Sequence, residues 1–340
     1  MHIFAWLLKR LPEDRHEKNF QTKIFFVLLA TYLLTQTVFA QRIESSLRNQ
    51  WTTHYFGRFK LDLPAGSEVV SDYKLYNEKV ELISKNGTFD LVSIVAQKTD
   101  ELKKGIAYGT SSRYEKTVPL SNGSVLILSK LGDFYTFHAY FFTSKNTLYR
   151  MIAQSISANG IDGAINKARL ISESIYYRRP SDAPPAGAFA LEEGYTTLGA
   201  AQSLEGIYMG AQISTHPGTF VSLLTQRIVE HDENLIQRFE SESGGGLASG
   251  MIQILSKTKT LRKRERMVGS LKAEEVAIAT LIDGKRFYTF QIEYAGLLKS
   301  NTSPFIDLRL GTHEVGSDFK SDEEALAFWD SVVDSLRPSP

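Results

Sequence analysis

The sequence predicts an α+β protein of two similar lobes. Each lobe is a mainly antiparallel sheet closed by a C-terminal helix, and an N-terminal signal or anchor segment precedes them. Three observations predict this class: residues 305–338 have the pattern of a strand followed by an amphipathic helix, one tetrapeptide occurs twice in similar surroundings, and prolines concentrate between the two copies. The predicted divisions are 1–40 (signal peptide or membrane anchor), 41–50 (tether), 51–179 (first lobe), 180–188 (linker) and 189–340 (second lobe).

Length and composition are those of an ordinary globular protein with room for two domains. The chain has 340 residues, of which 42% are hydrophobic and 23% charged, and its formal net charge is +1. A charge so close to zero does not favour a nucleic-acid partner. The chain has no cysteine, which excludes disulfides, thiolate zinc sites and cysteine nucleophiles.

The most apolar run of the chain, 24–40, follows Lys23 and ends in small residues. This pattern favours an export signal cut between Ala40 and Gln41. A retained anchor in the inner membrane is the alternative, because 17 residues are near the shortest length that spans a bilayer. In either case we expect the body of the protein in the periplasm, because the positive residues precede the apolar run.

The first lobe is predicted to be mostly strands. Phe59, Leu61 and Leu63 alternate with polar residues before the turn at Pro64. Further strands are predicted at 80–83 and 89–96 around a turn at 85–87, at 125–131 and 134–142 around Gly132-Asp133, and at 148–155. A closing helix is indicated by apolar residues in steps of three and four: Ile161, Ile165, Ala168, Ile171 and Ile175.

The linker holds three of the ten prolines, so it is predicted to be stiff. The second lobe repeats the plan, with strands predicted at 189–191, 206–215, 251–256, 275–281 and 287–294. A strand at 305–310 and a helix then end the chain. Ser321 and Glu324 have the spacing of a capping box, and one helical face carries Leu326, Trp329, Val333 and Leu336.

The two halves share a sequence as well as a plan. Residues 134–137 and 287–290 both read Phe-Tyr-Thr-Phe, and each half ends with a helix and an Arg-Pro pair. Coincidence between aromatic-rich strands is the alternative. Because strand order and terminal helix agree, we favour a duplicated module, which predicts a two-lobed clamp with a cleft between the lobes.

No catalytic set is visible in the sequence. The seven histidines are scattered outside any zinc motif, and we expect His138 to be a packed or solvated strand residue. The glycine-rich run 243–250 lacks both a nucleophile elbow and the Gly-Lys-Ser/Thr ending of a phosphate loop. The basic cluster 257–266 is interpreted as a solvated strand face that could dock an acidic partner. The sequence therefore predicts no enzyme, no cofactor and no metal.

Three stretches resemble a known family. The stretch Gly57-Arg58-Phe59-Lys60-Leu61-Asp62-Leu63-Pro64-Ala65 is similar to the opening of two-domain immunity proteins (Tli type). These proteins protect bacteria from type VI secretion lipase effectors of group four. Residues 206–218, ending in His216-Pro217-Gly218, resemble the start of that family's second domain, and 321–338 resemble its closing helix. Many relatives carry a lipid-anchored cysteine that this chain lacks.

The resemblance implies an exported binding protein that holds a phospholipase effector inactive by covering its active site or lid. Loops at the lobe tips are the expected contacts: 108–113, 198–205, 244–250 and 312–319. The residues predicted to contact the partner are Gln202, Glu205, Gly245, His313, Glu314 and Arg113. The alternative is an exported two-lobed module that binds a small envelope ligand in the interlobe cleft, and a hydrolase is a third hypothesis without a visible nucleophile.

Overall fold

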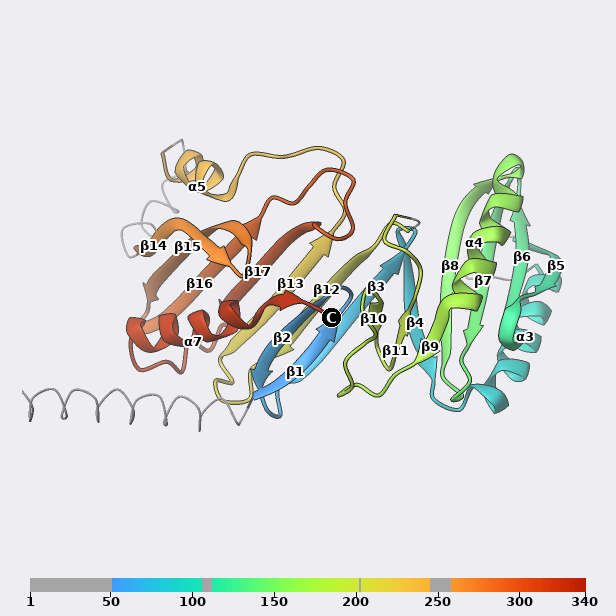
Figure 1. The fold of residues 1–340 in the computed structure, drawn as a ribbon, viewed down its shortest axis with the longest axis horizontal. Coiled ribbons are helices and arrows are strands. Elements are labelled where there is room, and N and C mark those ends of the chain that lie inside the picture. The colour runs from blue at the N-terminus through green and yellow to red at the C-terminus, as the bar shows by residue number, and fades with distance from the viewer. Residues whose placement is uncertain (1–50, 106–111, 202, 245–257) are drawn as a thin grey trace, which may run out of the picture. The chain divides into compact units, whose positions relative to one another are not determined.

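The computed structural model describes residues 51–105, 112–201, 203–244 and 258–340. Residues 52–340 form one compact unit in which antiparallel strands build the sheets and helices lie against them (Figure 1). The α+β class predicted from the sequence is confirmed. The predicted signal or anchor (1–40), the tether (41–50) and the predicted strand at 251–256 lie outside the described residues.

The elements fall into two runs. The first run comprises β1 (Trp51–Phe56), β2 (Phe59–Pro64), β3 (Glu68–Leu75), β4 (Glu78–Ser84), α3 (Gly87–Lys103), β5 (Arg113–Pro119), β6 (Val125–Leu131), β7 (Phe134–Phe142), β8 (Leu148–Ser157), α4 (Ile161–Ser174) and β9 (Ile175–Tyr177), with short 3-10 turns before β6 and α4. The second run comprises β10 (Phe189–Leu191), β11 (Gly194–Thr196), β12 (Gly206–Gln212), β13 (Thr219–Gln226), α5 (Leu235–Gly244), β14 (Thr258–Val268), β15 (Leu271–Ile282), β16 (Lys285–Tyr294), β17 (Phe305–Thr312), α7 (Asp322–Ser335) and β18 (Arg337–Pro338). Within the described residues both runs have one order: a hairpin, two strands, a helix, four strands, a helix and a short final strand.

Twelve strands form one sheet in the order β14-β15-β16-β17-β13-β12-β3-β4-β8-β7-β6-β5. The sheet consists of two halves with the same strand order. Read from its edge to the centre, one half is β14-β15-β16-β17-β13-β12 and the other is β5-β6-β7-β8-β4-β3, so β14 corresponds to β5 and β12 to β3. The two half-sheets join where these last two pair, with Gly206 opposite Lys74 and Gln212 opposite Glu68. We call β3–β8 the first half-sheet and β12–β17 the second. Such internal symmetry is what a duplicated module produces.

Two small sheets exchange elements between the runs. The hairpin β1–β2 is completed by β18 from the end of the second run, with Lys60 opposite Arg337. The hairpin β10–β11 is completed by β9 from the end of the first run, with Tyr195 opposite Tyr176. Each run therefore closes a sheet that the other run begins.

The repeated tetrapeptides occupy equivalent strands, β7 and β16. Setting them in register equates Phe137 with Phe290 and Tyr140 with Glu293. The closing helices α4 and α7 each have 14 residues, so counting from their first residues equates Ala168 with Trp329. These two registers allow the half-sheets to be compared residue by residue.

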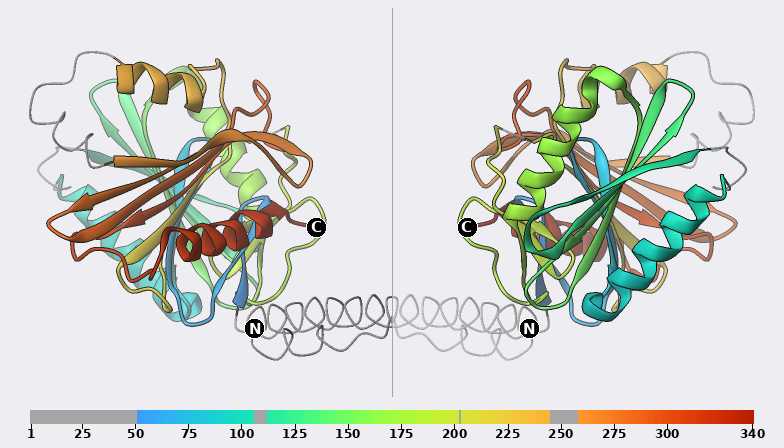
Figure 2. Two further views of the ribbon diagram at one scale, coloured as in Figure 1. Left: turned by 90° about the vertical axis from the view of Figure 1, so that its left-hand side faces the viewer. Right: turned by 90° about the vertical axis from the view of Figure 1, so that its right-hand side faces the viewer.

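Each half-sheet has a helix on both faces. In the first, α3 and α4 lie on opposite sides of the strands (Figure 2). The α3 side is packed around a buried cluster of Leu102, Ile127, Tyr140 and Leu148. In the second, α5 lies on the side of Glu274 and α7 on the side of Glu275, as their hydrogen bonds to these neighbouring residues show.

The capping box predicted for the last helix forms in part. Ser321 Oγ accepts a hydrogen bond from Glu324 N at 3.2 Å, as predicted. The Glu324 carboxylate accepts from the N–H of Lys320 at 2.5 Å, one residue before the expected donor. Three of the four residues of the predicted apolar face are buried, since Trp329 and Val333 are fully buried and Leu336 is 4% exposed; Leu326 is half-buried.

The prediction of a strand at 89–96, preceded by a turn at 85–87, is wrong. These residues belong to α3, because Leu91, Ile94 and Val95 reach the buried cluster at helical spacing. Phe89 is 82% exposed and Val92 73% exposed, so the nearly continuous apolar run does not mark a buried strand. Burial of one helical face overrode the β-branched composition.

The segment predicted as a stiff linker is bound at both of its ends. The buried Arg178 donates hydrogen bonds to the carbonyls of Pro180 and Asp182, among others. Gly187 N donates to Pro340 O at 2.9 Å, and its carbonyl accepts from Arg58 at 2.6 Å. The lobe boundaries predicted at 51–179 and 189–340 stay a prediction.

Candidate protein-interaction surface

A groove of about 790 Å³ lies on the α5 side of the second half-sheet. Its walls come from α5, the loop before it, and the strands β13, β14, β15, β16 and β17. Seven carboxylates and three cations line it, beside His231: Glu230, Asp232, Glu233, Glu265, Glu274, Glu293, Asp307, Arg238, Lys272 and Arg309. We call it the acidic groove, and its volume is in the range of ligand-binding clefts.

The floor of the acidic groove is a row of carboxylates on adjacent strands. Glu274 lies directly opposite Glu293, and Glu293 lies opposite Asp307. Glu293 is 7% exposed and Asp307 5% exposed. Like charges at opposed positions repel, and burial costs further free energy, so the row requires compensating donors.

Neighbouring side chains supply that compensation. Arg238 of α5 donates to Glu293 at 2.5 Å, and Arg309 donates to Asp307 at 2.6–3.0 Å. Gln291 Nε2 joins the row, 2.7 Å from Glu293 and 3.1 Å from Asp307. These hydrogen bonds raise the pKa of Arg238 and of Arg309, because each guanidinium is held in its charged form.

The rim of the groove keeps an excess of negative charge. Glu230, Asp232 and Glu233 are exposed and form no ion pair with other described residues. Glu265 pairs with Lys272 at 2.8 Å, and Glu274 accepts the N–H of Ile236 at 2.9 Å. The groove therefore presents carboxylates at its entrance, a charge pattern complementary to Lys and Arg side chains.

The corresponding place in the first half-sheet has a different chemistry. There the row equivalent to Glu274, Glu293 and Asp307 is Val125, Tyr140 and Arg150, as the pairings of β6, β7 and β8 show. Val125 and Tyr140 are covered by Leu102 of the 17-residue α3, whereas α5 has 10 residues. The row equivalent to the floor of the groove is therefore not acidic in the first half-sheet.

Glu205, a predicted contact residue, is internal. It is 6% exposed, and its carboxylate accepts two hydrogen bonds from Arg58, at 2.6 and 2.7 Å, and one from Ser203. Arg58 follows β1, so this ion pair fastens the first hairpin to the second run. In this conformation the carboxylate has no free surface for a partner.

Of the other predicted contacts, His313 and Glu314 lie on the second run and Arg113 on the first. His313 and Glu314 follow β17 and are exposed; His313 Nε2 lies 2.6 Å from Gln212 Oε1, and Val315 beside them is 70% exposed. Arg113 is exposed at the start of the edge strand β5, opposite Lys130. Gln202 and Gly245 lie outside the described residues. None of the four described residues lines the acidic groove.

The basic cluster of β14 is solvated only in part: Lys259, Lys263 and Arg264 are exposed, whereas Arg262 and Arg266 are half-buried. Glu275, fully buried, accepts hydrogen bonds from Arg264 at 2.6 Å and Arg266 at 3.2 Å, and from Trp329 Nε1 at 2.8 Å. On α7, Asp330 pairs with Arg262 and Asp334 pairs with Arg266. Arg262 and Arg266 therefore fasten α7 to the sheet, whereas Arg264 pairs with Glu275 of β15 and keeps about half of its side chain exposed.

His138 is a packed strand histidine, as expected. It is 8% exposed, with Nε2 3.3 Å from Ser129 Oγ. Burial, helped by the charge of Lys98, lowers the pKa of His138 to about 4. Its ring is therefore neutral at pH 7 and packs as a polar core residue.

Within the described ranges, no group of three or more His, Asp or Glu side chains is placed to bind a metal ion. No helix in the same ranges has both the length and the apolar content needed to cross a membrane. The run 24–40, predicted as signal or anchor, is not among those residues.

Residues 183–340 match the family model described as the Tle cognate immunity protein 4 C-terminal domain. This half of the chain therefore resembles the C-terminal domain of Tli4 immunity proteins. The Tli-type resemblance predicted from the sequence is thereby confirmed, and it extends beyond the matched domain.

Solved structures match most of the chain. The apo immunity protein TplEi of the type VI secretion system from Pseudomonas aeruginosa is 28% identical, with a TM-score of 0.75 over 85% of this chain and 97% of that one. A crystal structure of a Tle4–Tli4 complex matches at 27% identity and a TM-score of 0.77, over 86% and 99% of the two chains. TplEi complexed with an "L" peptide matches at 26% identity and a TM-score of 0.73, over 86% and 99%. Among curated proteins none matches the chain.

The structure explains why the Gly57-Arg58-Phe59 motif is suited to a Tli4-like chain. Gly57 has φ +57, and a Cβ there would lie 2.8 Å from the ring of Phe189 in β10. Arg58 pairs with Glu205, and Phe59 is 2% exposed. The motif therefore joins the first hairpin to the second run, which is a structural role.

Proposed function

We propose that the protein is a periplasmic immunity protein that binds a type VI secretion phospholipase effector and blocks its active site or lid. The observation that carries the proposal is the match over 86% of the chain to a structure solved as a Tle4–Tli4 complex. The protein acts by binding and catalyses no reaction. The effector is its only proposed ligand; no nucleic acid and no cofactor is involved.

We propose that two lobes, meeting at the β12–β3 pair, grip the effector between surfaces from both runs. On the second run the acidic groove receives basic side chains of the effector, because its exposed rim carries Glu230, Asp232 and Glu233. The loop of His313 and Glu314, with the exposed Val315, and Arg113 on the first run are further contacts. Opposite charges across an interface accelerate association and fix its orientation.

The N-terminal run 24–40 directs the chain across the inner membrane in this proposal. It is removed before Gln41, or it is retained as an anchor that holds the protein facing the periplasm. Both forms place the immunity protein in the compartment where a phospholipase meets membrane lipids.

The test uses the phospholipase encoded beside this gene. Cells that export the effector to the periplasm should survive when the full chain is co-expressed and lyse when it is absent. Purified proteins should associate with a Kd near or below about 10 nM, the affinity typical of strong standard-size interfaces. Cell death despite co-expression, with no binding in vitro, would refute the proposal.

The acidic groove can be tested within the same assay. Replacing Glu230, Asp232 and Glu233 together by Lys should weaken association by about a hundredfold, since three rim charges are reversed. The rate of association of the wild-type pair should also fall as salt is raised, because exposed charges are screened. A control reverses Asp133, which is exposed in the turn between β6 and β7, away from the acidic groove. An unchanged Kd for the triple variant would remove the groove from the interface.

A further inference from the structure

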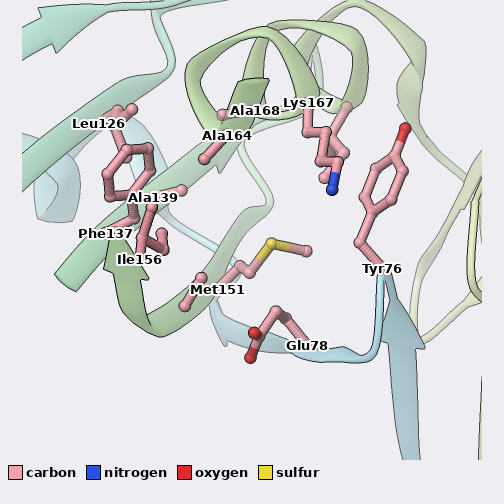
Figure 3. A pocket seen from close by; sticks show the side chains of 12 residues that line it. Tyr76, Glu78, Leu126, Phe137, Ala139, Met151, Ile156, Ala164, Lys167 and Ala168 are labelled. Carbon is pink, nitrogen blue, oxygen red and sulfur yellow. The ribbon is translucent and has the colours of Figure 1, made fainter. Parts of the chain in front are cut away.

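A small apolar pocket lies between α4 and the first half-sheet (Figure 3). Its volume is 140 Å³, and its inner wall is formed by Leu126, Phe137, Ala139, Met151 and Ile171. Leu126 and Ile171 are fully buried, and Phe137 and Ala139 are each 3% exposed. The pocket interior therefore offers hydrocarbon and one thioether, with no charged group.

The pocket exists because of one difference between the closing helices. Ala168 of α4 lines it, and the equivalent residue of α7 is Trp329. Trp329 is fully buried, and its ring centroid lies 6.0 Å from that of Phe290. Phe290 is in turn the equivalent of Phe137, which lines the pocket. The space that an indole fills in the second half is open in the first.

Two further substitutions agree with this reading. Ala139 of the pocket wall corresponds to Ile292, so a second large side chain of the second half is small here. Leu126 corresponds to Glu275, because Leu126 is paired with Ala139 and Glu275 is paired with Ile292. An apolar side chain thus replaces the buried carboxylate. The first half thus replaces a tryptophan bonded to a buried carboxylate with an apolar cavity.

The mouth of the pocket is polar and carries both charges. Tyr76, at the turn between β3 and β4, has its ring 5.1 Å from Lys167 Nζ of α4, and Glu78 lies on the opposite side (Figure 3). Tyr76 and Asn77 both have positive φ, which fixes the tight turn that carries the ring. A polar rim around an apolar pocket is the arrangement found where a single anchor side chain is bound.

The volume limits what can enter. An engineered cavity of about 150 Å³ lined by Leu, Ile and Phe stays dry and binds benzene or xenon. A pocket of 140 Å³ has the same capacity, so it accepts one ring or one branched aliphatic group and is too small for a long acyl chain.

We propose that this pocket binds a single apolar side chain, of the size of Phe or Leu, presented by the effector. The assignment of the effector as its source depends on the proposed function, whereas the capacity for a benzene-sized group does not. In the bound state the apolar anchor lies against Phe137 and Met151, and the rim of Tyr76, Lys167 and Glu78 shields it from water.

The pocket is tested first without any effector. Benzene is titrated into the wild-type chain labelled at its methionine methyl groups, and binding is read from the Met151 resonance. The wild type should show a saturable shift, and Ala168→Trp, which installs the side chain of the sibling helix, should show none. Asn166→Trp, on the exposed side of the same helix, should bind benzene like the wild type. If Ala168→Trp fails to fold, Ala139→Ile fills the pocket instead.

The effector is then titrated against the same variants. Ala168→Trp should raise the Kd at least tenfold, and Asn166→Trp should change it less than twofold. If the wild type does not bind benzene, the proposal that the pocket binds an apolar group is refuted. If the wild type binds benzene but Ala168→Trp leaves the Kd for the effector unchanged, the side chain in the pocket does not come from the effector. The pocket is then a site for a free apolar molecule. Failure of the wild type to bind any effector refutes the proposed function and the effector side chain together, while the benzene result still decides the pocket.

Discussion

The two half-sheets share a strand order but leave opposite faces open. The first covers one face with the long α3 and keeps an apolar pocket beneath α4. The second fills the space beneath α7 with Trp329 and keeps an acidic groove on its α5 face. Because the strand order is the same in both, the unlike surfaces come from side chains and from the length of one helix. A duplicated fold can thus acquire two unlike surfaces without changing its topology.

The largest expected loss of stability comes from replacing Trp329 by alanine, the residue found at the equivalent position 168 of the first half. Trp329→Ala should lower the free energy of unfolding by about 5 kcal/mol, combining a large cavity with a buried carboxylate, Glu275, that loses a donor. Urea denaturation measures the change. Val315→Ala, at a site 70% exposed, is the control and should shift stability by less than about 0.5 kcal/mol. A loss below about 1 kcal/mol for Trp329→Ala would contradict the packing comparison.

The next effect concerns the ion pair that joins the two runs. Arg58→Ala leaves Glu205 buried and unpaired, so unfolding should become easier by about 3–5 kcal/mol. Arg150→Ala is the matched control, because its pair with Glu81 is about 40% exposed on both sides and lies within the first half. That exposed pair should contribute at most about 1 kcal/mol. Equal losses for the two variants would show that Arg58 does not hold the exchanged hairpin.

The smallest expected effect is a pH dependence of stability that comes from His138, whose equivalent in the second half is Gln291. Burial lowers the pKa of His138 to about 4 in the folded protein, so the unfolded chain binds the proton first. The stability from a neutral His138 is therefore complete above pH 6.5 and is lost as pH falls towards 4, by up to about 3 kcal/mol. His138→Gln, which installs the equivalent of Gln291, should flatten this dependence. Unfolding midpoints between pH 7 and 4 measure it, with exposed His231→Gln as control; identical slopes for His138→Gln and wild type would contradict the assignment.

Local patterns predicted much of the fold. The strands predicted where β2, β6, β7 and β17 lie are confirmed, as is the apolar spacing of α4 and α7. The predicted alternation of burial holds in β2, whereas β17 is buried on both sides over most of its length. The alternating burial of β13 was not predicted, although its inward residues Val221 and Leu223 are fully buried. Helix α3 was mistaken for a strand, because only its tertiary contacts show which apolar residues are buried.

The candidate site could be predicted far less well. Proposed contacts were sought in loops, whereas the acidic groove is built mainly on strands, from residues as distant in sequence as Glu274 and Asp307. Its signal was present as carboxylates within otherwise apolar strands, yet only strand pairing shows that they align. The same holds for Glu205, whose partner Arg58 lies 147 residues away.

The most direct test of binding as the function is a titration of the effector's phospholipase activity with this protein. We predict that activity falls linearly and is abolished at one immunity protein per effector, with no lipid hydrolysis by the immunity protein alone. Full effector activity in the presence of excess protein would contradict the account.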